Sequence, residues 1–575
     1  MKLTFKNQLA LLAVFTLILG QLKTWSQTRP NIIVILTDDM GYADIGFNNG
    51  AADIASPNID ALANAGTIFT SAYVAHPFCG PSRTALLTGR YPHKIGAQYN
   101  LSDTEYNKGV DLNETFFSNV IKTSGYKTGA FGKWHLGQST AHQPNSRGFD
   151  YFYGMLTGGH NYFTTSGGTA AYALPLRKNY GLANEAIGAY ITDLFSDEAV
   201  TFIQNAESND GAPFFMYVAY NAPHEPMQAL QSDMDILAAA PYNFTYTTSN
   251  RQKYAAMVYS VDRGVKKIVD ALKANGEYND TLIVFLSDNG GIVSGGNANN
   301  GPLKGNKGDT YEGGYRVPMM MHWPNHIPAG VKYDYVVSSL DFYPTFVNLA
   351  GATIPTGKKL DGKDIYNNIV NNTNPRAGES IFVLRHRALN NVGIRRDQWK
   401  AYSSGDGTWQ LYNLNTDIGE TTNLADSNQS LLNTMVSGGY QWSRTNIDAL
   451  FFDSTAAENT WNSNNLPDYP KTFTGYTVDL SVPKFLSNQL PFVYLYPNPA
   501  AYSNLSIGLN FEPTDAIDIY IYDVLGRPVQ IHNNAKIEVN NEVQLQLNSN
   551  IQNGTYFVRV VSGENSFSQT LIVKR

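Results

Sequence analysis

The chain has 575 residues, and its composition excludes several classes of protein. A chain of this length exceeds what one hydrophobic core usually supports, so several domains are expected. A hydrophobic fraction of 43% excludes general disorder, and a net charge of −7 argues against bulk attraction to nucleic acid or anionic membranes. The single cysteine, Cys79, excludes an intramolecular disulfide and any cysteine-based zinc or iron–sulfur cluster.

Residues 1–26 are predicted to be a signal peptide. Lys2 and Lys6 form a short basic region, and the apolar run 9–19 that follows is too short to span a bilayer comfortably. The alternative is an N-terminal anchor helix, which is disfavoured because no other run in the sequence has transmembrane length. A lipid anchor would need a cysteine just after the apolar run, and the sequence has none there. The mature protein is therefore expected to be exported, soluble and without a transmembrane segment.

Residues 27–375 are predicted to form an α/β domain, because short apolar runs alternate there with helical patterns. Continuous apolar runs are typical of parallel strands that are buried on both faces. The predicted strands are 31–36, 213–220, 281–286 and 317–323, and the predicted helices are 57–65, 116–123, 251–275 and 340–349, with a further helix that Pro81 starts and Gly89 ends.

Two smaller units are predicted to follow. Asn-rich residues around Pro375 indicate a boundary, and residues 376–490 are interpreted as a smaller α+β subdomain with its linker. Its predicted strands lie within 381–402 and at 409–414, with a helix at 427–436. Residues 491–575 are predicted to be an all-β module, with alternating apolar and polar residues at 516–522 and 555–561. This module holds no constellation of acids, bases or nucleophiles.

Oxygen-bearing side chains follow two of the predicted strands. Asp38 and Asp39 come just past the first strand, and Asp288 and Asn289 come just past the strand at 281–286. Carboxylate and amide oxygens are hard ligands suited to Ca²⁺ or Mg²⁺. Each pair alone is as well explained by helix caps and turns. Their shared position at the carboxyl ends of parallel strands favours a metal site.

Cys79 lies where a helix is predicted to begin, with Pro81 in its first turn and Gly89 at its end. A helix N-terminus presents backbone N–H donors and positive dipole, so it attracts anions. Arg83 opposes that dipole, and this cost indicates a functional purpose. A lone cysteine is otherwise most often a small buried apolar residue.

The segment Cys79-x-Pro81-Ser82-Arg83 with Thr88-Gly89-Arg90 resembles the signature of the formylglycine-dependent sulfatases. That family belongs to the alkaline-phosphatase-like superfamily, which implies a large mixed, mostly parallel sheet flanked by helices, with a smaller C-terminal subdomain. The resemblance covers about residues 30–445. Its further segments follow in family order at 30–42, 132–137, 222–226, 287–290, 307–314 and 409–424.

The resemblance implies a modified residue, a metal and a set of roles. Cys79 would be converted by a dedicated maturase to formylglycine (3-oxoalanine), whose hydrate attacks sulfur and later expels sulfate. One Ca²⁺ would be held by Asp38, Asp39, Asp288, Asn289 and the modified Cys79. Arg83 would hold the diol and the carboxylates in position, and Lys133 and Lys307 would neutralise sulfate oxygens. His135 would be the base of the elimination step. His224 would be the general acid, assisted by Lys307.

The substrate is expected to be a sulfated carbohydrate. Residues 139–186 are rich in Gly, Asn, Tyr and Thr and are predicted to form a loop that shapes the substrate pocket. His160, Arg147 and His322 are candidate sugar contacts, the alternative being turns and a structural histidine. Algal galactans or related glycans are the first hypothesis. The alternatives are a phosphodiesterase or phosphonate monoester hydrolase of the same superfamily, or an inactive glycan-binding relative.

The C-terminal module carries a second resemblance. Tyr496-Pro497-Asn498-Pro499, together with the segments 522–527, 554–558 and 571–575, is similar to the C-terminal sorting domain of type IX secretion substrates. This implies the Sec and type IX export machineries as partners, and a secreted or cell-surface location. The alternative is a structural or carbohydrate-binding β-domain.

Overall fold

The structure of the protein is a computed structural model. It describes residues 29–463, except 49, 165–174 and 388–389, and then residues 472–473. Within 493–574 it describes all but 497, 499, 501–503, 510–512, 514–515, 538–541 and 564. The predicted signal peptide and the predicted boundary at residue 490 lie outside the described residues. The chain divides into two compact units, Met1–Gly475 and Tyr476–Arg575, and each is described by itself.

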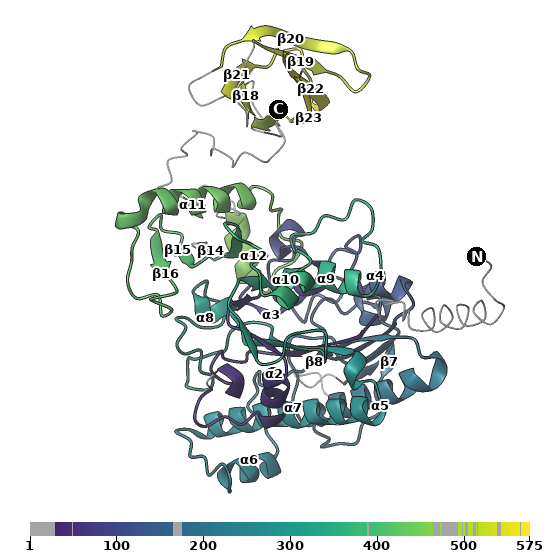
Figure 1. Ribbon diagram of the computed structural model, residues 1–575. Helices are drawn as coiled ribbons and strands as arrows, with labels where there is room; N and C mark the ends of the chain where they lie inside the picture. The colour runs from purple at the N-terminus through teal and green to yellow at the C-terminus, as the bar shows by residue number, and fades with distance from the viewer. Residues whose placement is uncertain are drawn as a thin grey trace, which may run out of the picture. The chain divides into compact units, whose positions relative to one another are not determined.

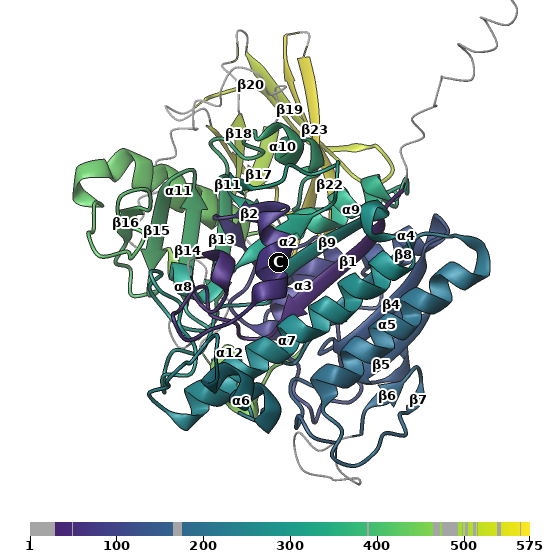
Figure 2. The same ribbon diagram turned by 60° about the horizontal axis from the view of Figure 1, so that its bottom comes forward.

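A ten-stranded mixed sheet forms the centre of the first unit, in the order β11-β2-β10-β9-β1-β8-β4-β5-β6-β7 (Figures 1 and 2). Its middle strands are parallel, and all residues of β1 and β9 are buried, as expected for strands covered on both faces. These strands are β9 (Thr281–Ser287), β1 (Asn31–Thr37), β8 (Phe214–Ala219), β4 (Lys127–Lys133) and β5 (Tyr151–Met155). The predicted fold class is confirmed.

Helices cover both faces of this sheet because alternate residues of each strand point to opposite sides. Ile33 and Ile35 of β1 join the core under α2 (Pro57–Asn64), α5 (Ile191–Asp210) and α7 (Ser249–Ala274). Figure 2 shows α5 and α7 lying across the strands on that face. Ile32 and Val34 join the other core, under α3 (Cys79–Thr88), α4 (Phe117–Thr123) and α9 (Phe342–Leu349).

Strand direction changes at one side of the sheet. The strand β10 (Met319–His322) runs antiparallel to both β9 and β2 (Thr67–Phe69), and β11 (Val331–Tyr333) then pairs with β2 in parallel. The shorter elements of the unit are β3 (Ala72–Tyr73), β6 (Arg177–Lys178), β7 (Gly181–Leu182), α6 (Gln231–Ala238), α8 (Glu312–Tyr315), β12 (Val337–Ser338), α10 (Tyr366–Asn371) and α12 (Thr455–Ser463).

The C-terminal part of the first unit is a four-stranded antiparallel sheet with a helix, as predicted. Its strands are β13 (Ser380–Arg385), β14 (Asn391–Arg396), β15 (Trp399–Ser403) and β16 (Gln410–Asn413), and its helix is α11 (Gln429–Ser443). The predicted helix ended at residue 436, which is seven residues short. Gly439 does not end the helix. A Cβ there would lie 2.6 Å from the Ile394 side chain, so the glycine allows close packing on β14.

The second unit consists of two antiparallel sheets, which confirms the prediction of an all-β module. One is β17 (Val493–Tyr496), β18 (Asn504–Leu509) and β21 (Glu542–Gln546), and the other is β20 (Pro528–Ala535), β19 (Ile517–Tyr522), β22 (Gly554–Ser562) and β23 (Asn565–Val573). Alternate residues of β19 are buried. Among all the residues that the structure describes, no helix has the length and apolar character needed to cross a bilayer.

Buried charges join the small sheet to the main domain. Glu312, the first residue of α8, accepts hydrogen bonds from Tyr73 at 2.6 Å and from Lys400 of β15 at 3.1 Å. The same Lys400 ammonium lies 3.4 Å from the Glu420 carboxylate. All of these side chains are buried, and the two carboxylates share Lys400 as a cationic partner. Glu312 also pairs with Arg316 at 3.2 Å.

We expect Lys400→Met to destabilise the protein by about 3–5 kcal/mol, because it leaves Glu312 and Glu420 buried beside each other with less positive charge. Chemical denaturation, followed by tryptophan fluorescence, measures this loss. Lys359→Met makes the same change at an exposed position and should alter stability by less than about 0.5 kcal/mol. Equal unfolding midpoints for the two variants would contradict the assigned role of Lys400.

Candidate active site

Four of the five expected metal ligands come together where β1 and β9 end. Thr37 pairs with Ser287 in the parallel ladder, so the residues that follow these strands emerge side by side. Oxygen atoms of Asp38, Asp39 and Asp288 all lie within 4.8 Å of one another. Asn289 joins them, and its Nδ2 donates to Asp39 Oδ1 at 2.7 Å.

The donor atoms of this cluster fit a divalent cation. Asp38 Oδ1, Asp39 Oδ2 and Asn289 Oδ1 are buried and accept no hydrogen bond from any described residue. A buried acceptor without a donor is costly, whereas Ca²⁺ is bound by such oxygens. Burial and then the neighbouring Asp38 charge raise the pKa of Asp288 to about 7, as expected where carboxylates crowd one buried site. The residues therefore form an acidic site suited to a divalent metal.

Cys79 is placed beside this cluster by the start of α3. The helix begins at Cys79 and ends at Gly89, whose φ of 65° places it in the left-handed region that glycine readily adopts. The thiol is buried, and the Lys307 ammonium donates to its Sγ at 3.3 Å. Burial raises the pKa of the Cys79 thiol to about 11, so the unmodified side chain is protonated at neutral pH. It lacks the lowered pKa that activates cysteine nucleophiles.

Arg83 lies one helical turn beyond Cys79 and faces the carboxylates. Its guanidinium is fully buried and binds Asp288 Oδ2 at 2.9 Å through Nε and at 2.7 Å through Nη2. Its Nη1 donates to the Lys133 carbonyl at 2.9 Å. The acidic partners offset the cost of burying a cation in the first turn of a helix.

Two lysines complete the charge balance. Lys133, the last residue of β4, places its Nζ 2.5 Å from Asp38 Oδ2, and the Lys307 Nζ lies 2.6 Å from Asp39 Oδ1. Together with Arg83, they place three basic groups against the three carboxylates. A mixed cluster of this kind can accept a divalent cation and an anionic ester together without a large net charge.

Two histidines flank the cluster, and burial lowers the pKa of both, which favours neutral imidazoles. His224 follows β8, with its Nε2 3.7 Å from Asp39 Oδ2 and its Nδ1 2.6 Å from the Glu225 carbonyl. That carbonyl can only accept, so Nδ1 is the donor and Nε2 faces the carboxylates. His135 follows β4 with a φ of 60°, and Asp39 has a φ of 62°. Such strain in non-glycine residues is typical of functional sites.

The three expected sugar contacts lie at different edges of the sheet. His160 follows β5, at the same carboxyl edge as the cluster, and its carbonyl accepts from Asn221 at 3.2 Å. Arg147 precedes β5 and donates to the carbonyls of Asp111 and Glu114, so it belongs to the opposite edge. His322 pairs with Ile283, about 16 Å along β9 from Asp288. The structure therefore does not bring Arg147 or His322 to this site.

Two residues outside the motifs found in the sequence also contact segments of this site. Asn100 accepts a hydrogen bond from the Gly80 N–H at 2.9 Å and so supports the start of α3. Arg385, at the end of β13, donates to the carbonyl of Gly308, next to Lys307. Neither has a local sequence signal, because each acts through a partner far away in the chain.

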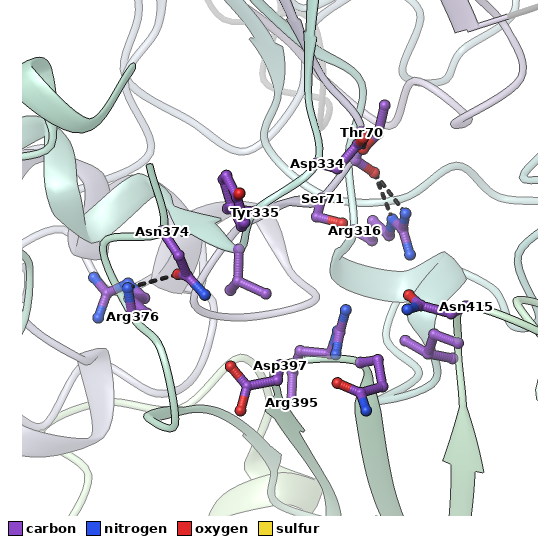
Figure 3. A pocket seen from close by; sticks show the side chains of 13 residues that line it. Thr70, Ser71, Arg316, Asp334, Tyr335, Asn374, Arg376, Arg395, Asp397 and Asn415 are labelled. Atoms are coloured by element: carbon purple, nitrogen blue, oxygen red, sulfur yellow. Dashed lines mark hydrogen bonds between the residues drawn. The ribbon is translucent and has the colours of Figure 1, made fainter. Parts of the chain in front are cut away.

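A cavity of about 540 Å³ lies away from this cluster, between the main domain and the small sheet (Figure 3). None of the clustered residues lines it. Arg316 donates to the Thr70 carbonyl at 2.6 Å and to Glu312, and Arg376 pairs with Asp341. The described lining of this cavity holds no cysteine, histidine or lysine, so it offers no reactive group to compare with Cys79.

Comparison with known proteins identifies three regions. Residues 30–352 match the model of the sulfatase family, and residues 306–436 match that of the C-terminal region of N-sulphoglucosamine sulphohydrolase. Residues 494–574 match the secretion system C-terminal sorting domain. The chain belongs to the sulfatase family. The family expected from the motifs, its class of sulfuric ester hydrolases and the sorting domain are therefore confirmed.

The individual relatives agree with this result. The uncharacterized sulfatase YdeN of Escherichia coli (strain K12) is 37% identical over 387 residues, which span 58% of this chain and 65% of that protein. N-acetylgalactosamine-6-sulfatase of Mus musculus is 31% identical over 421 residues, or 70% of this chain and 77% of that enzyme. The solved structure of Ps i-CgsB in complex with k-i-k-neocarrahexaose has 48% identity and a TM-score of 0.74, and the match covers 77% of this chain and 99% of that chain.

We expect the protein, once treated with EDTA, to bind one Ca²⁺, and Asp39→Asn to weaken that binding at least about tenfold. The variant removes a charged ligand but keeps the side-chain size, and asparagine tolerates the left-handed backbone. Isothermal titration calorimetry measures the affinity. Asp280→Asn, at an exposed carboxylate, is the matched control. Unchanged affinity in Asp39→Asn would exclude this cluster as the calcium site.

Proposed function

We propose that this sulfatase removes sulfate from sulfated carbohydrates, with Cys79 oxidised to formylglycine as the nucleophile and one Ca²⁺ in the acidic cluster. The main support is the convergence at one sheet edge of Cys79 with three carboxylates and three basic side chains. They come from distant segments of the chain. A glycan-binding protein without catalysis would not need this buried and balanced set of charges.

The environment of Cys79 supports oxidation of this residue. Its thiol is protonated at neutral pH, so the sulfur would be a weak nucleophile. Conversion of the CH₂–SH group to an aldehyde removes sulfur and two hydrogens and adds one oxygen. A maturase would need to reach the residue before folding, because Cys79 is 2% exposed in the folded chain.

The neighbouring side chains are suited to a sulfate ester. The Lys133 and Lys307 ammonium groups would neutralise sulfate oxygens, and Arg83 would keep the carboxylates in place. His224 donates its Nδ1–H to the Glu225 carbonyl, so it would protonate the leaving oxygen as the imidazolium, from a second proton on Nε2 whose charge Asp38 and Asp39 would stabilise. His135, as a neutral imidazole, would take the proton when sulfate is expelled. A bound Ca²⁺ would supply Lewis-acid stabilisation of negative charge on oxygen.

The substrate class is supported by the relative that is 48% identical. Its structure contains k-i-k-neocarrahexaose, whose name places it among the carrageenans, which are sulfated algal galactans. We therefore propose an algal galactan, or an oligosaccharide derived from one, as the substrate. Of the three expected sugar contacts, His160 is the one that lies at the carboxyl edge of the sheet, where the cluster is. The sorting domain supports type IX export after Sec transport, and a secreted or cell-surface location.

Sulfate release distinguishes the proposal from the phosphorus alternative. We expect protein co-expressed with a maturase to hydrolyse aryl sulfate, and to release sulfate from at least one member of a panel of defined galactan oligosaccharides. Ion chromatography measures the sulfate, and an aryl phosphonate monoester is tested in parallel. A higher kcat/KM for the phosphonate would instead favour a phosphonate monoester hydrolase.

We expect Cys79→Ala to lower kcat by roughly 10³-fold or more, because it removes the nucleophile. Wild-type protein that keeps an unconverted cysteine is the matched control, and it should be as inactive as the variant. Intact-mass analysis shows how much of each sample has been converted. Full activity in protein that retains its thiol would exclude formylglycine as the nucleophile.

A further inference from the structure

A second cavity, of about 190 Å³, lies next to Cys79 and is not explained by the catalytic cluster. It is formed by three separate parts of the chain. These are the segments on either side of α3 (His76, Phe78, Gln98, Tyr99 and Asn100), the end of β13 (Arg385, His386 and Arg387), and the region of α12 (Asp453, Ala457 and Thr460).

The cavity shares its wall with the catalytic site. Phe78 immediately precedes Cys79, and the Arg385 guanidinium stacks 4.2 Å from the centre of its ring. Both Arg385 and Arg387 donate to the Gly308 carbonyl, the latter at 3.2 Å. Because Gly308 follows Lys307, basic groups extend from the Cys79 sulfur into the cavity.

The charge of the lining favours an anionic ligand. Arg385 and Arg387 contribute two guanidiniums, while Asp453 is the one carboxylate that lines the described cavity. Arg387 also lies 3.7 Å from Asp309, but the two side chains are 41% and 34% exposed, so solvent weakens this pair. A guanidinium has five N–H donors, and its planar arrangement suits tetrahedral oxyanions.

The uncharged lining favours a sugar. Gln98 Oε1 and both ring nitrogens of His76 are buried and have no hydrogen-bond partner among the described residues. Hydroxyl groups can both donate to and accept from such atoms. Tyr99 and Phe78 add aromatic surface. The volume is below the roughly 300–1,000 Å³ of typical ligand sites, so the cavity suits one sugar ring rather than a stretch of polymer.

We propose that this cavity binds the sugar next to the one that loses its sulfate, and that Arg387 and Arg385 recognise a second sulfate on that neighbouring sugar. The proposal rests on the proposed sulfatase function and refines its substrate to a multiply sulfated oligosaccharide. Arg387 is the more informative residue to change, because it is exposed and its loss disturbs the Lys307 segment less than loss of the less exposed Arg385.

The test compares kcat/KM for three substrates. These are an aryl sulfate, a galactan oligosaccharide with one sulfate per disaccharide, and its counterpart with two. We expect Arg387→Gln to lower kcat/KM for the doubly sulfated substrate roughly ten- to hundredfold, mainly through KM, with less than a twofold change for the other two. The charge reversal Arg387→Glu should enlarge the selective loss. Arg396→Gln, at the opposite end of the small sheet, is the matched control.

An equal loss on all three substrates, or no loss on the doubly sulfated one, would overturn the assignment of this cavity. Melting temperatures within about 2 °C of the wild-type value show that the Arg387 variants are folded. Hydrolysis of the aryl sulfate by wild-type protein tests the sulfatase function without involving this cavity. Failure of the cavity proposal can therefore be told apart from failure of the proposed sulfatase function. If wild-type protein released no sulfate from any substrate, the sulfatase function itself would fail, whatever the variants do.

Discussion

The arrangement of the site depends on the buried contact between Arg83 and Asp288. The guanidinium is fully buried, and two of its nitrogens bind a single carboxylate oxygen, at 2.7 and 2.9 Å. A third nitrogen binds the Lys133 carbonyl, so one side chain connects the helix of Cys79, the end of β9 and the end of β4. Neither charge could remain buried without the other. This mutual dependence holds Cys79 in place relative to the carboxylates.

The parallel topology of the middle strands explains why the site lies at one edge of the sheet. Parallel strands end together, so the residues after β1, β9, β8 and β4 meet without long connecting loops. Asp39 and His135 both leave their strands with a positive φ, which turns the chain sharply. Such turns are unfavourable for residues other than glycine, and the surrounding hydrogen bonds and ion pairs keep them in place.

Most of this arrangement could be predicted from the sequence, because buried strands and site motifs are local patterns. Asp38 and Asp288 each follow a continuous apolar run, which marks a strand end. The direction of a strand is not local. His322 follows an apolar run of the same kind, but β10 is antiparallel, so its carboxyl end lies at the opposite edge. Arg147 and His160 were placed in one predicted loop, and the unpredicted strand β5 separates them.

The small C-terminal sheet is part of the active site because it positions the segment that carries Lys307. The Lys307 N–H donates to the Gly291 carbonyl, and the Gly308 N–H donates to the Pro77 carbonyl, which are both contacts within the main domain. From the other side, Arg385 binds the Gly308 carbonyl, and Lys400 binds Glu312, five residues beyond Lys307. Contacts with both domains therefore hold Lys307 beside Cys79. The substrate recognition proposed for that sheet and the catalysis proposed for the large one thus depend on the same short segment.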